Sequence, residues 1–275
     1  MNRRSESTAG WPERLVRDGY AILPDVASPS DLAGLIEATA SYSEGEHDGR
    51  LDRRGEVYGG RDLLWRVPAA AELARSPALI TIAEAVIGPG AFAVRGLFFD
   101  KTATVNWNLP WHQDLTIAVR ERRDVPGFGP WTRKGGIPHA HAPAELLARM
   151  ITIRLHLDDC GPDSGPMRVL PGSHRSGRLD PAEVSAWTAR AGELAVDAIV
   201  PAGGAVVMHP LLLHASSART GPGRRRVIHL EYAAEMLPGG LEWYVAESLT
   251  PPMPIRPGEP ATCRIRIGDF EKPQS

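Results

Sequence analysis

Two short motifs, each a histidine and an aspartate separated by one residue, stand out in this 275-residue chain with its nine histidines. They are His112-Gln113-Asp114 and His156-Leu157-Asp158. Residues two apart on a β-strand point to the same face, so each motif would direct an imidazole and a carboxylate into one space. One histidine from a second strand would complete the two-histidine, one-carboxylate set that suits non-haem Fe(II) and leaves coordination positions open.

The surroundings of the two motifs favour the first as a metal site. His156 lies in an apolar run, residues 151–157, that an ordinary sheet strand explains. His112 follows a proline in a segment that is not a simple apolar strand. A histidine at the end of a strand in this way suits a metal ligand better than a core residue. His214 ends another apolar run 100 residues after Asp114, which leaves room for several intervening strands.

The elements that would hold these residues change from helix to strand along the chain. Helices are predicted at 11–18, 28–41 and 76–88, with a short strand at 20–23, and residues 43–62 show no period and are expected to form a loop. Short β-branched or aromatic runs then predict seven strands, at 91–100, 151–158, 167–171, 196–200, 205–213, 226–233 and 263–267. A helical stretch near 181–192 interrupts them. We predict one α+β domain over residues 1–275, with helices first and then a mainly antiparallel β core.

Two segments outside this pattern, residues 43–62 and 118–148, are candidates for a substrate site. The insert at residues 118–148 is rich in proline, glycine and charge, and a loop of that length is typically a lid or binding loop. Candidate wall residues are Trp131 and Arg120 in the insert, with Trp107 and Gln113 shortly before it. Residues 1–10 are polar, and we expect them to be loosely held.

Composition excludes several classes of protein. The 28 glycines and 25 prolines are too many for a long-helix architecture, and a formal charge of −2 gives no electrostatic footprint for nucleic acid. Cys160 and Cys263 are too few for a disulfide framework, and neither a secretory signal nor a membrane-spanning run is recognisable. We expect a cytoplasmic monomer or homodimer that acts on a small molecule, with no nucleic-acid or membrane partner.

Four motifs in order resemble the phytanoyl-CoA dioxygenase family. They are residues 18–23 before a Ser-Pro helix start, residues 111–114, residues 164–174, and His214-Ala215-Ser216 with Arg225 eleven residues after the histidine. The agreement runs from about residue 14 to 235. The resemblance implies a double-stranded β-helix (jelly-roll, cupin-like) core with flanking N-terminal helices. It also implies an oxygenase that uses Fe(II) and 2-oxoglutarate, with O2 as co-substrate.

The resemblance also implies roles for individual residues. His112, Asp114 and His214 match the catalytic iron ligands of the family. Arg225 matches the arginine that pairs with the distal carboxylate of 2-oxoglutarate, and Ser216 matches a hydroxyl contact to the same group. A planar carboxylate suits the fixed fork of a guanidinium, which lysine does not offer.

Other charged residues near these positions have two explanations each. Strand alternation puts Arg224 and Arg226 on one face and Arg225 on the other, and periodicity alone leaves open which face lines a cofactor cavity. Arg95 and Lys101 lie where relatives place cofactor or substrate contacts, and exposed charges on a strand explain them equally well. The histidine at 174 is expected to be structural.

The reaction implied is hydroxylation of an unactivated C–H bond of a small metabolite, with release of succinate and CO2. Related halogenases lack the carboxylate ligand, so Asp114 disfavours halogenation, while desaturation, epoxidation and cyclisation stay open. An alternative of another class is a cupin-like Zn(II) or Mn(II) hydrolase or isomerase, because His and Asp ligands accept those metals too. A catalytically silent binding module is a third. Arg225 favours the oxygenase, because a hydrolase needs no dicarboxylate anchor.

Overall fold

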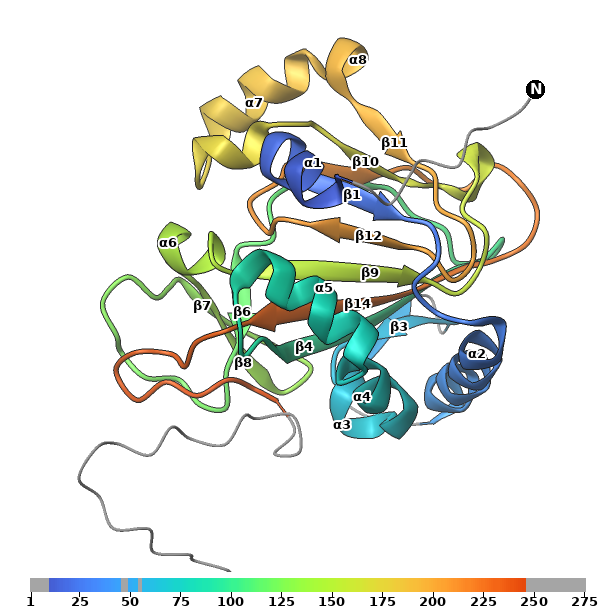
Figure 1. The fold of residues 1–275 in the computed structure, drawn as a ribbon, viewed down its shortest axis with the longest axis horizontal. Helices are drawn as coiled ribbons and strands as arrows, with labels where there is room; N and C mark the ends of the chain where they lie inside the picture. Colours follow the sequence, from blue (N-terminus) through green and yellow to red (C-terminus); the bar gives the residue numbers. More distant parts are fainter. Residues whose placement is uncertain (1–9, 46–48, 54–55, 246–275) are drawn as a thin grey trace, which may run out of the picture.

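The computed structural model describes residues 10–45, 49–53 and 56–245, whose strands form three antiparallel sheets (Figure 1). The strand orders are β1-β12-β9-β14-β4-β3-β2, β11-β10-β13-β5 and β6-β8-β7. The first sheet contains β1 (Tyr20–Leu23), β2 (Arg50–Arg53), β3 (Glu56–Gly60), β4 (Phe92–Lys101), β9 (Ile151–His156), β12 (Ala205–Met208) and β14 (Arg225–Ala233). The other sheets contain β5 (Leu109–His112), β6 (Thr116–Ala118), β7 (Trp131–Lys134), β8 (Ile137–His141), β10 (Met167–Val169), β11 (Val196–Ala198) and β13 (His214–Ser216).

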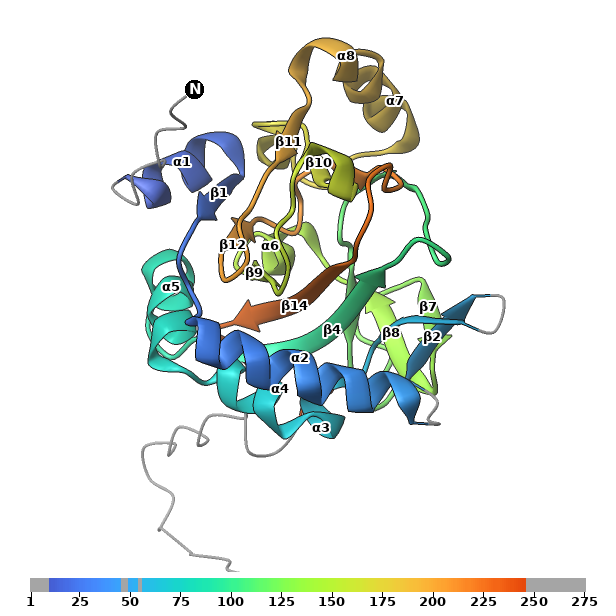
Figure 2. The same ribbon diagram turned by 90° about the vertical axis from the view of Figure 1, so that its right-hand side faces the viewer.

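The helices that precede β4 in the chain cover one face of the seven-stranded sheet, whereas α7 (Pro181–Ala189) and α8 (Ala191–Leu194) lie beside the four-stranded sheet (Figure 2). The other helices are α1 (Trp11–Asp18), α2 (Pro29–Glu44), α3 (Leu63–Arg66), α4 (Pro68–Ala74), α5 (Pro77–Ile87) and α6 (Ala144–Leu147). Helices α3 and α4 contact β4, α5 contacts β9, and α2 contacts β3. None of the helices in the described ranges is long and apolar enough to cross a membrane.

The helix starts follow the capping signals in the sequence. The Ser28 hydroxyl accepts a hydrogen bond from the backbone N–H of Asp31, and Ser76 does the same for Leu79. Asp180 caps α7 in the same way, and each of the three helices has proline in its first turn. Capping satisfies N–H groups that the first turn leaves without partners, and proline there loses no hydrogen bond. The predicted starts at 28 and 76 are confirmed.

Alternation along the central strands separates a hydrophobic core from a polar inner face. On β14, Ile228, Leu230 and Tyr232 are buried in the cluster beneath the helices, whereas Arg225 and His229 line a cavity on the other side. Strands β9 and β4 repeat the pattern, with Ile151, Ile153, Leu155 and Phe98 in the core and Arg154, Leu97 and Phe99 at the cavity. Burial contributes about 1.5–3 kcal/mol for each such core side chain, which lets the sheet support a polar inner face.

The prediction of a loop over residues 43–62 is wrong for much of that segment. Helix α2 continues to Glu44, and β2 and β3 form an antiparallel hairpin. The glycines of β3 suggested a loop, but Gly59 lets the backbone of β3 lie close to that of the neighbouring strand β4 and does not form a turn. A Cβ at Gly59 would lie 2.1 Å from the backbone oxygen of Phe98 on the neighbouring strand β4.

The insert at 118–148 is also more regular than the predicted lid-like loop. It contains β7, β8 and α6, and β8 pairs with β6 and β7 in the three-stranded sheet. The run at 205–213 divides as well, since β12 ends at Met208 and His214 begins β13 in the other sheet. The strand predicted at 263–267 and residues 1–9 lie outside the described residues.

The left-handed backbone at Gly19 gives a test of how α1 is attached. Gly19 ends α1 with φ of 83°, and an added Cβ would lie 2.5 Å from Nδ1 of His174, whose Nε2 lies 3.2 Å from the Val16 oxygen. We expect Gly19→Ala to lower the free energy of unfolding by about 1–3 kcal/mol. Gly34→Ala should raise it by about 0.5–1 kcal/mol, because its added Cβ on α2 would meet nothing within 4 Å. Urea unfolding measures both, and equal stability of the two variants would contradict this account.

Candidate functional site

Three potential metal ligands converge from one end of the four-stranded sheet. Strands β5 and β13 pair so that His214 lies opposite His112. Asp114 lies two residues after β5, and its backbone N–H donates to the oxygen of Pro210 at 2.9 Å. One ligand atom from each of His112, Asp114 and His214 lies within 4.8 Å of the other two. Register and backbone contacts thus bring together the histidine and aspartate pair and the distant third residue.

The two imidazoles are oriented by the backbone. Nδ1 of His112 lies 2.8 Å from the Pro110 oxygen, and Nδ1 of His214 lies 2.9 Å from the Leu212 oxygen. Only a protonated Nδ1 can donate to a carbonyl, so each ring presents the lone pair of Nε2. The Nε2 atoms lie 3.8 Å and 3.6 Å from the Asp114 carboxylate oxygens. Metal-binding histidines characteristically use their second nitrogen in this way.

The donor set fits a divalent transition metal. Oδ2 of Asp114 is buried without a hydrogen-bond partner among the described residues, which is costly for a carboxylate unless a cation binds it. Burial lowers the pKa of His214 to about 3, so this imidazole is neutral and able to ligate at physiological pH. Two imidazoles and one carboxylate match the set of non-haem Fe(II). The residues present therefore fit the iron centre that the sequence motifs imply.

A small cavity of about 70 Å³ adjoins these ligands, between the seven-stranded and four-stranded sheets. Arg225 is only 2% exposed, and its Nη1 donates to the Gly165 oxygen at 3.0 Å, while its Nε has no partner among the described residues. Lys101 is fully buried, and its Nζ donates to Ser216 Oγ at 3.0 Å and to the Ser217 oxygen at 2.6 Å. The sequence-predicted Arg225, Ser216 and Lys101 are thus brought together next to the metal ligands.

The cavity holds more positive charge than its neighbours neutralise. Arg154 lines the cavity together with Arg225, and its Nη1 lies 2.7 Å from Nδ1 of His229. Lys101 lies directly behind the lining residue Ser216. Burial and then the charge of Arg225 lower the pKa of Lys101 to about 7. A small dianion would relieve this accumulation of charge, because it would pair with buried cations that otherwise repel one another.

The three consecutive arginines of β14 and the loop before it have separate partners. Arg224 pairs with Asp100, with its Nε 2.8 Å from Oδ2, and Arg226 pairs with Asp158, with its Nη2 2.6 Å from Oδ1. Arg225 points to the opposite side and lines the cavity. Asp100 and Asp158, neither of which lines the cavity, therefore hold the two flanking arginines away from it, and this settles which face of the strand the sequence left open.

The alternative motif at residues 156–158 does not form a metal site with other described ligands. Asp158 is engaged by Arg226, and both ring nitrogens of His156 are buried without a hydrogen-bond partner among the described residues. Burial holds the pKa of His156 well below its usual range, so the ring is neutral.

The remaining predicted site residues lie at different distances from the ligands. Trp107 lines the small cavity, with Lys101 Nζ 5.0 Å from the ring centroid. Arg95 pairs with Glu231 at 2.7 Å and lines an adjoining cavity. Gln113 also borders that cavity, but its amide is engaged in holding loops, since it donates to the Gly177 and Leu211 oxygens and accepts from the Leu179 N–H.

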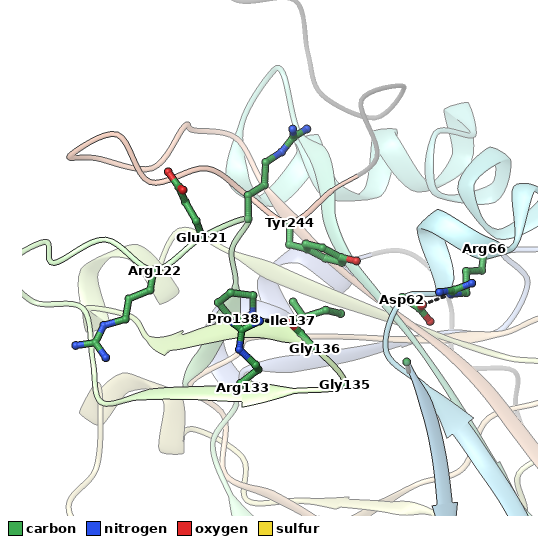
Figure 3. A pocket seen from close by; sticks show the side chains of 12 residues that line it. Asp62, Arg66, Glu121, Arg122, Arg133, Gly135, Gly136, Ile137, Pro138 and Tyr244 are labelled. Carbon is green, nitrogen blue, oxygen red and sulfur yellow. Dashed lines mark hydrogen bonds and ion pairs between the residues drawn. The ribbon is translucent and has the colours of Figure 1, made fainter. Parts of the chain in front are cut away.

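Trp131 and Arg120 are not brought to the ligands. Trp131 packs partly against the hydrophobic core, with the Arg122 guanidinium 5.7 Å from its ring centroid. Arg120 pairs with Glu242 at 3.6 Å and lines a separate cavity of about 360 Å³, into which Arg133 and Tyr244 also point (Figure 3). Trp131 and Arg120 follow His112 and Asp114 closely in the sequence, but neither lines a cavity beside these ligands.

Sequence reasoning missed Arg154 and His229. Both occur in apolar runs that were interpreted as ordinary strands. Arg154 alternates with Ile153 and Leu155, which face the core, so the period of two places it on the inner face. A charged residue that interrupts an otherwise apolar strand was thus the signal by which the sequence could have identified Arg154 as a cavity residue.

Comparisons with known proteins agree with this geometry. The model of the family "Phytanoyl-CoA dioxygenase (PhyH)" matches residues 15–227. L-proline trans-4-hydroxylase from Streptomyces griseoviridis is 25% identical over 250 residues, covering 80% of this chain and 84% of that protein. The structure of AviO1 from Streptomyces viridochromogenes Tue57 superposes with a TM-score of 0.63 at 24% identity, covering 84% of this chain and 96% of that one.

A further solved structure is similar in fold. EctD from S. alaskensis, crystallised with 2-oxoglutarate and 5-hydroxyectoine, gives a TM-score of 0.65 at 20% identity, covering 85% of this chain and 78% of that one. The family match spans most of the chain and confirms the resemblance found in the sequence motifs. The chain belongs to the phytanoyl-CoA dioxygenase family and is a 2-oxoglutarate-dependent non-haem iron dioxygenase, with Fe(II), 2-oxoglutarate and O2 as its cofactors and co-substrate.

Proposed function

We propose that this enzyme hydroxylates an unactivated C–H bond of a small metabolite and releases succinate and CO2. The fold that we propose for it is a double-stranded β-helix (jelly-roll) core with flanking N-terminal helices. The observation that carries the reaction is the junction of two features, a His112–Asp114–His214 group and a buried cavity of uncompensated cations. An iron ligand set explains the first feature, and a dicarboxylate co-substrate explains the second.

Each residue has a defined task in this proposal. His112, Asp114 and His214 hold Fe(II), and Arg225 binds the distal carboxylate of 2-oxoglutarate through its fixed fork of N–H donors. Lys101 adds a second cation that the Ser216 hydroxyl and the Ser217 oxygen hold in place. Leu97, Phe99 and Met167 give the cavity apolar walls that exclude water and strengthen these ionic contacts. Bound Fe(II) with 2-oxoglutarate supplies the activation of O2.

Hydroxylation is favoured over other outcomes by the similarity of this chain to one relative, L-proline trans-4-hydroxylase. Desaturation, epoxidation and cyclisation would use the same residues and differ only in the product. A Zn(II) or Mn(II) hydrolase or isomerase would use the ligands but would leave the cationic cavity without a purpose.

Succinate formation tests the proposal directly. Protein supplied with Fe(II), 2-oxoglutarate and air should form succinate, and isotopically labelled O2 should place one oxygen atom in the product of a substrate that stimulates turnover. Zn(II) or Mn(II) in place of Fe(II) should give no succinate. Absence of both uncoupled and substrate-driven succinate formation across a broad metabolite panel would contradict the oxygenase assignment.

The pKa of Lys101 predicts how 2-oxoglutarate affinity depends on pH. With a pKa of about 7 in the empty cavity, Lys101 is charged below neutral pH and loses its proton above it. A bound dianion keeps Lys101 protonated, so binding above pH 7 takes up a proton. The Kd of 2-oxoglutarate should therefore rise toward tenfold per pH unit, up to the pKa of Lys101 in the complex. The neighbouring Arg154 stays charged in this range, because burial lowers its pKa only to about 10.

Calorimetric titration of 2-oxoglutarate from pH 6 to pH 9, with Zn(II) replacing Fe(II), measures this slope. Lys101→Met should bind more weakly at low pH and show a nearly flat profile. A wild-type Kd that does not change between pH 7 and pH 9 would refute this role for Lys101.

A further inference from the structure

A second cavity, of about 300 Å³, lies next to the proposed metal ligands and is larger than the one that Arg225 lines. His112 and Asp114 border it at one end. Leu97 and Phe99 line both cavities and thus stand between them. Ligand sites in proteins typically occupy about 300–1,000 Å³, so this space suits a small molecule placed against the metal.

Positive charge gathers in this second cavity. Arg61, Arg95 and Lys134 all line it, together with His139 and His141. Arg61 follows β3, Arg95 lies on β4, and Lys134 ends β7, so the three cations come from elements far apart in the sequence. Among the described side chains, Asp114 lines the cavity and would be used by the metal, and Glu231 already pairs with the lining residue Arg95 at 2.7 Å.

Arg61 and Lys134 are the two cations without a side-chain hydrogen bond or ion pair to the described residues. Both are partly buried. Burial, followed by the charges of Arg95 and Arg61, lowers the pKa of Lys134, and burial also lowers the pKa of Arg61. Arg95, in contrast, donates to the Thr116 oxygen at 2.9 Å in addition to its ion pair. Two confined and unneutralised cations repel each other, and an anion between them would remove that cost.

We infer that the substrate of this oxygenase carries an oxyanion, a carboxylate or a phosphate, which Arg61 and Lys134 bind in the second cavity. This inference rests on the proposed oxygenase function. The apolar part of the substrate lies along Leu97, Phe99 and Leu115, and the carbon to be oxidised faces the end formed by His112 and Asp114. A guanidinium and an ammonium at one end and apolar walls beyond them select an anionic small molecule over a neutral or cationic one.

The small number of lysines provides a direct probe. The chain contains three, Lys101, Lys134 and Lys272, so protein labelled with ¹³C only in lysine gives three resolvable sets of side-chain signals. Loading with 2-oxoglutarate and diamagnetic Zn(II) fills the smaller cavity, which Arg225 lines. Acetate, inorganic phosphate and neutral acetamide are then titrated separately, and Lys134→Arg assigns the signal of Lys134.

We expect the Lys134 signal to shift saturably with at least one anion and not with acetamide. A response to acetate alone identifies a carboxylate substrate, and a response to phosphate alone identifies a phosphorylated one. Arg61→Gln should raise the Kd of the active anion at least about tenfold, because one of its two cations is lost. Arg133→Gln is the matched control, since Arg133 lies next to Lys134 on β7 but lines the separate cavity in Figure 3, and it should leave the Kd unchanged.

Absence of a saturable shift with both anions, an equal shift with acetamide, or an unchanged Kd in Arg61→Gln would overturn the inference. Uncoupled succinate formation separates this failure from a failure of the proposed function. Wild-type protein and the control Arg133→Gln should both form succinate without substrate, because Arg133 lines neither of the cavities beside the proposed ligands. Succinate formation without an anion response rejects only the anion site, whereas loss of succinate formation in the wild type rejects the oxygenase assignment.

Discussion

Asp114→Ala is expected to lower Fe(II)- and 2-oxoglutarate-dependent succinate formation by more than about 100-fold. Loss of a residue that only orients a ligand costs about 10–100-fold in metal affinity or activity, and loss of a ligand itself should exceed this. Asp114 is the one carboxylate in the group with His112 and His214, and its Oδ2 has no other partner among the described residues. The variant should therefore also lose Fe(II) affinity, as measured by equilibrium dialysis.

Stability measurements distinguish a lost ligand from a damaged fold. The metal-free variant should stay folded with a melting temperature close to that of the metal-free wild type, because one oxygen of the Asp114 carboxylate has no hydrogen-bond partner among the described residues. Added Fe(II) should raise the melting temperature of the wild type only, since a ligand stabilises the state that binds it. A metal-free variant that melts well below the wild type would show that Asp114 supports the fold.

Asp197→Ala is the matched control for this experiment. Asp197 lies on β11 of the same four-stranded sheet and pairs with Arg168 at 3.2 Å, and both side chains are partly exposed. A surface ion pair of this kind contributes about 0–1 kcal/mol. Succinate formation and Fe(II) affinity should remain close to those of the wild type, and a comparable loss would undermine the specific role of Asp114.

Local periodicity made part of the site predictable. The spacing of His112 and Asp114 predicted that their side chains share one space, and the apolar run that ends at His214 offered a third ligand. The family motifs supported His214 and added Arg225. The structure brings these residues together through the pairing of β5 with β13 and the inward side of β14. Register between strands that lie about 100 residues apart has no local signal, so order along the chain, not periodicity, supplied the third ligand.

The features that the sequence did not reveal depend on contacts between strands that are distant along the chain, and local residue patterns do not record such contacts. Arg154 is an inward cation in an apolar strand, and only the neighbouring His229 and the shape of the cavity explain its burial. Strands β3 and β7 carry glycine or polar residues because they form by pairing with neighbours rather than through hydrophobic alternation. Trp131 and Arg120 are close to the ligands in sequence only, since the strands of the insert direct them elsewhere.

Arg225→Lys is expected to raise the Kd of 2-oxoglutarate about 10- to 150-fold, although the charge is kept. Hydrogen bonds to charged groups are worth about 1.5–3 kcal/mol, and lysine cannot reproduce the two parallel N–H donors of a guanidinium. Arg225→Ala should cost more, because truncation of one member of a buried charged pair costs about 2–5 kcal/mol. At saturating 2-oxoglutarate, Arg225→Lys should recover much of the wild-type rate, so that KM changes more than kcat.

The flanking arginines make this experiment decisive. Arg224→Lys and Arg226→Lys change the same side chain one position away, but their partners are Asp100 and Asp158 outside the cavity. Their effect on the Kd of 2-oxoglutarate should stay within about threefold, which is the scale of a partly exposed ion pair. Equal weakening in all three variants would indicate a general disturbance of β14, and no weakening in Arg225→Lys would remove the dicarboxylate anchor. In that second case another cation, such as the buried Lys101 beside Ser216, would have to bind the distal carboxylate.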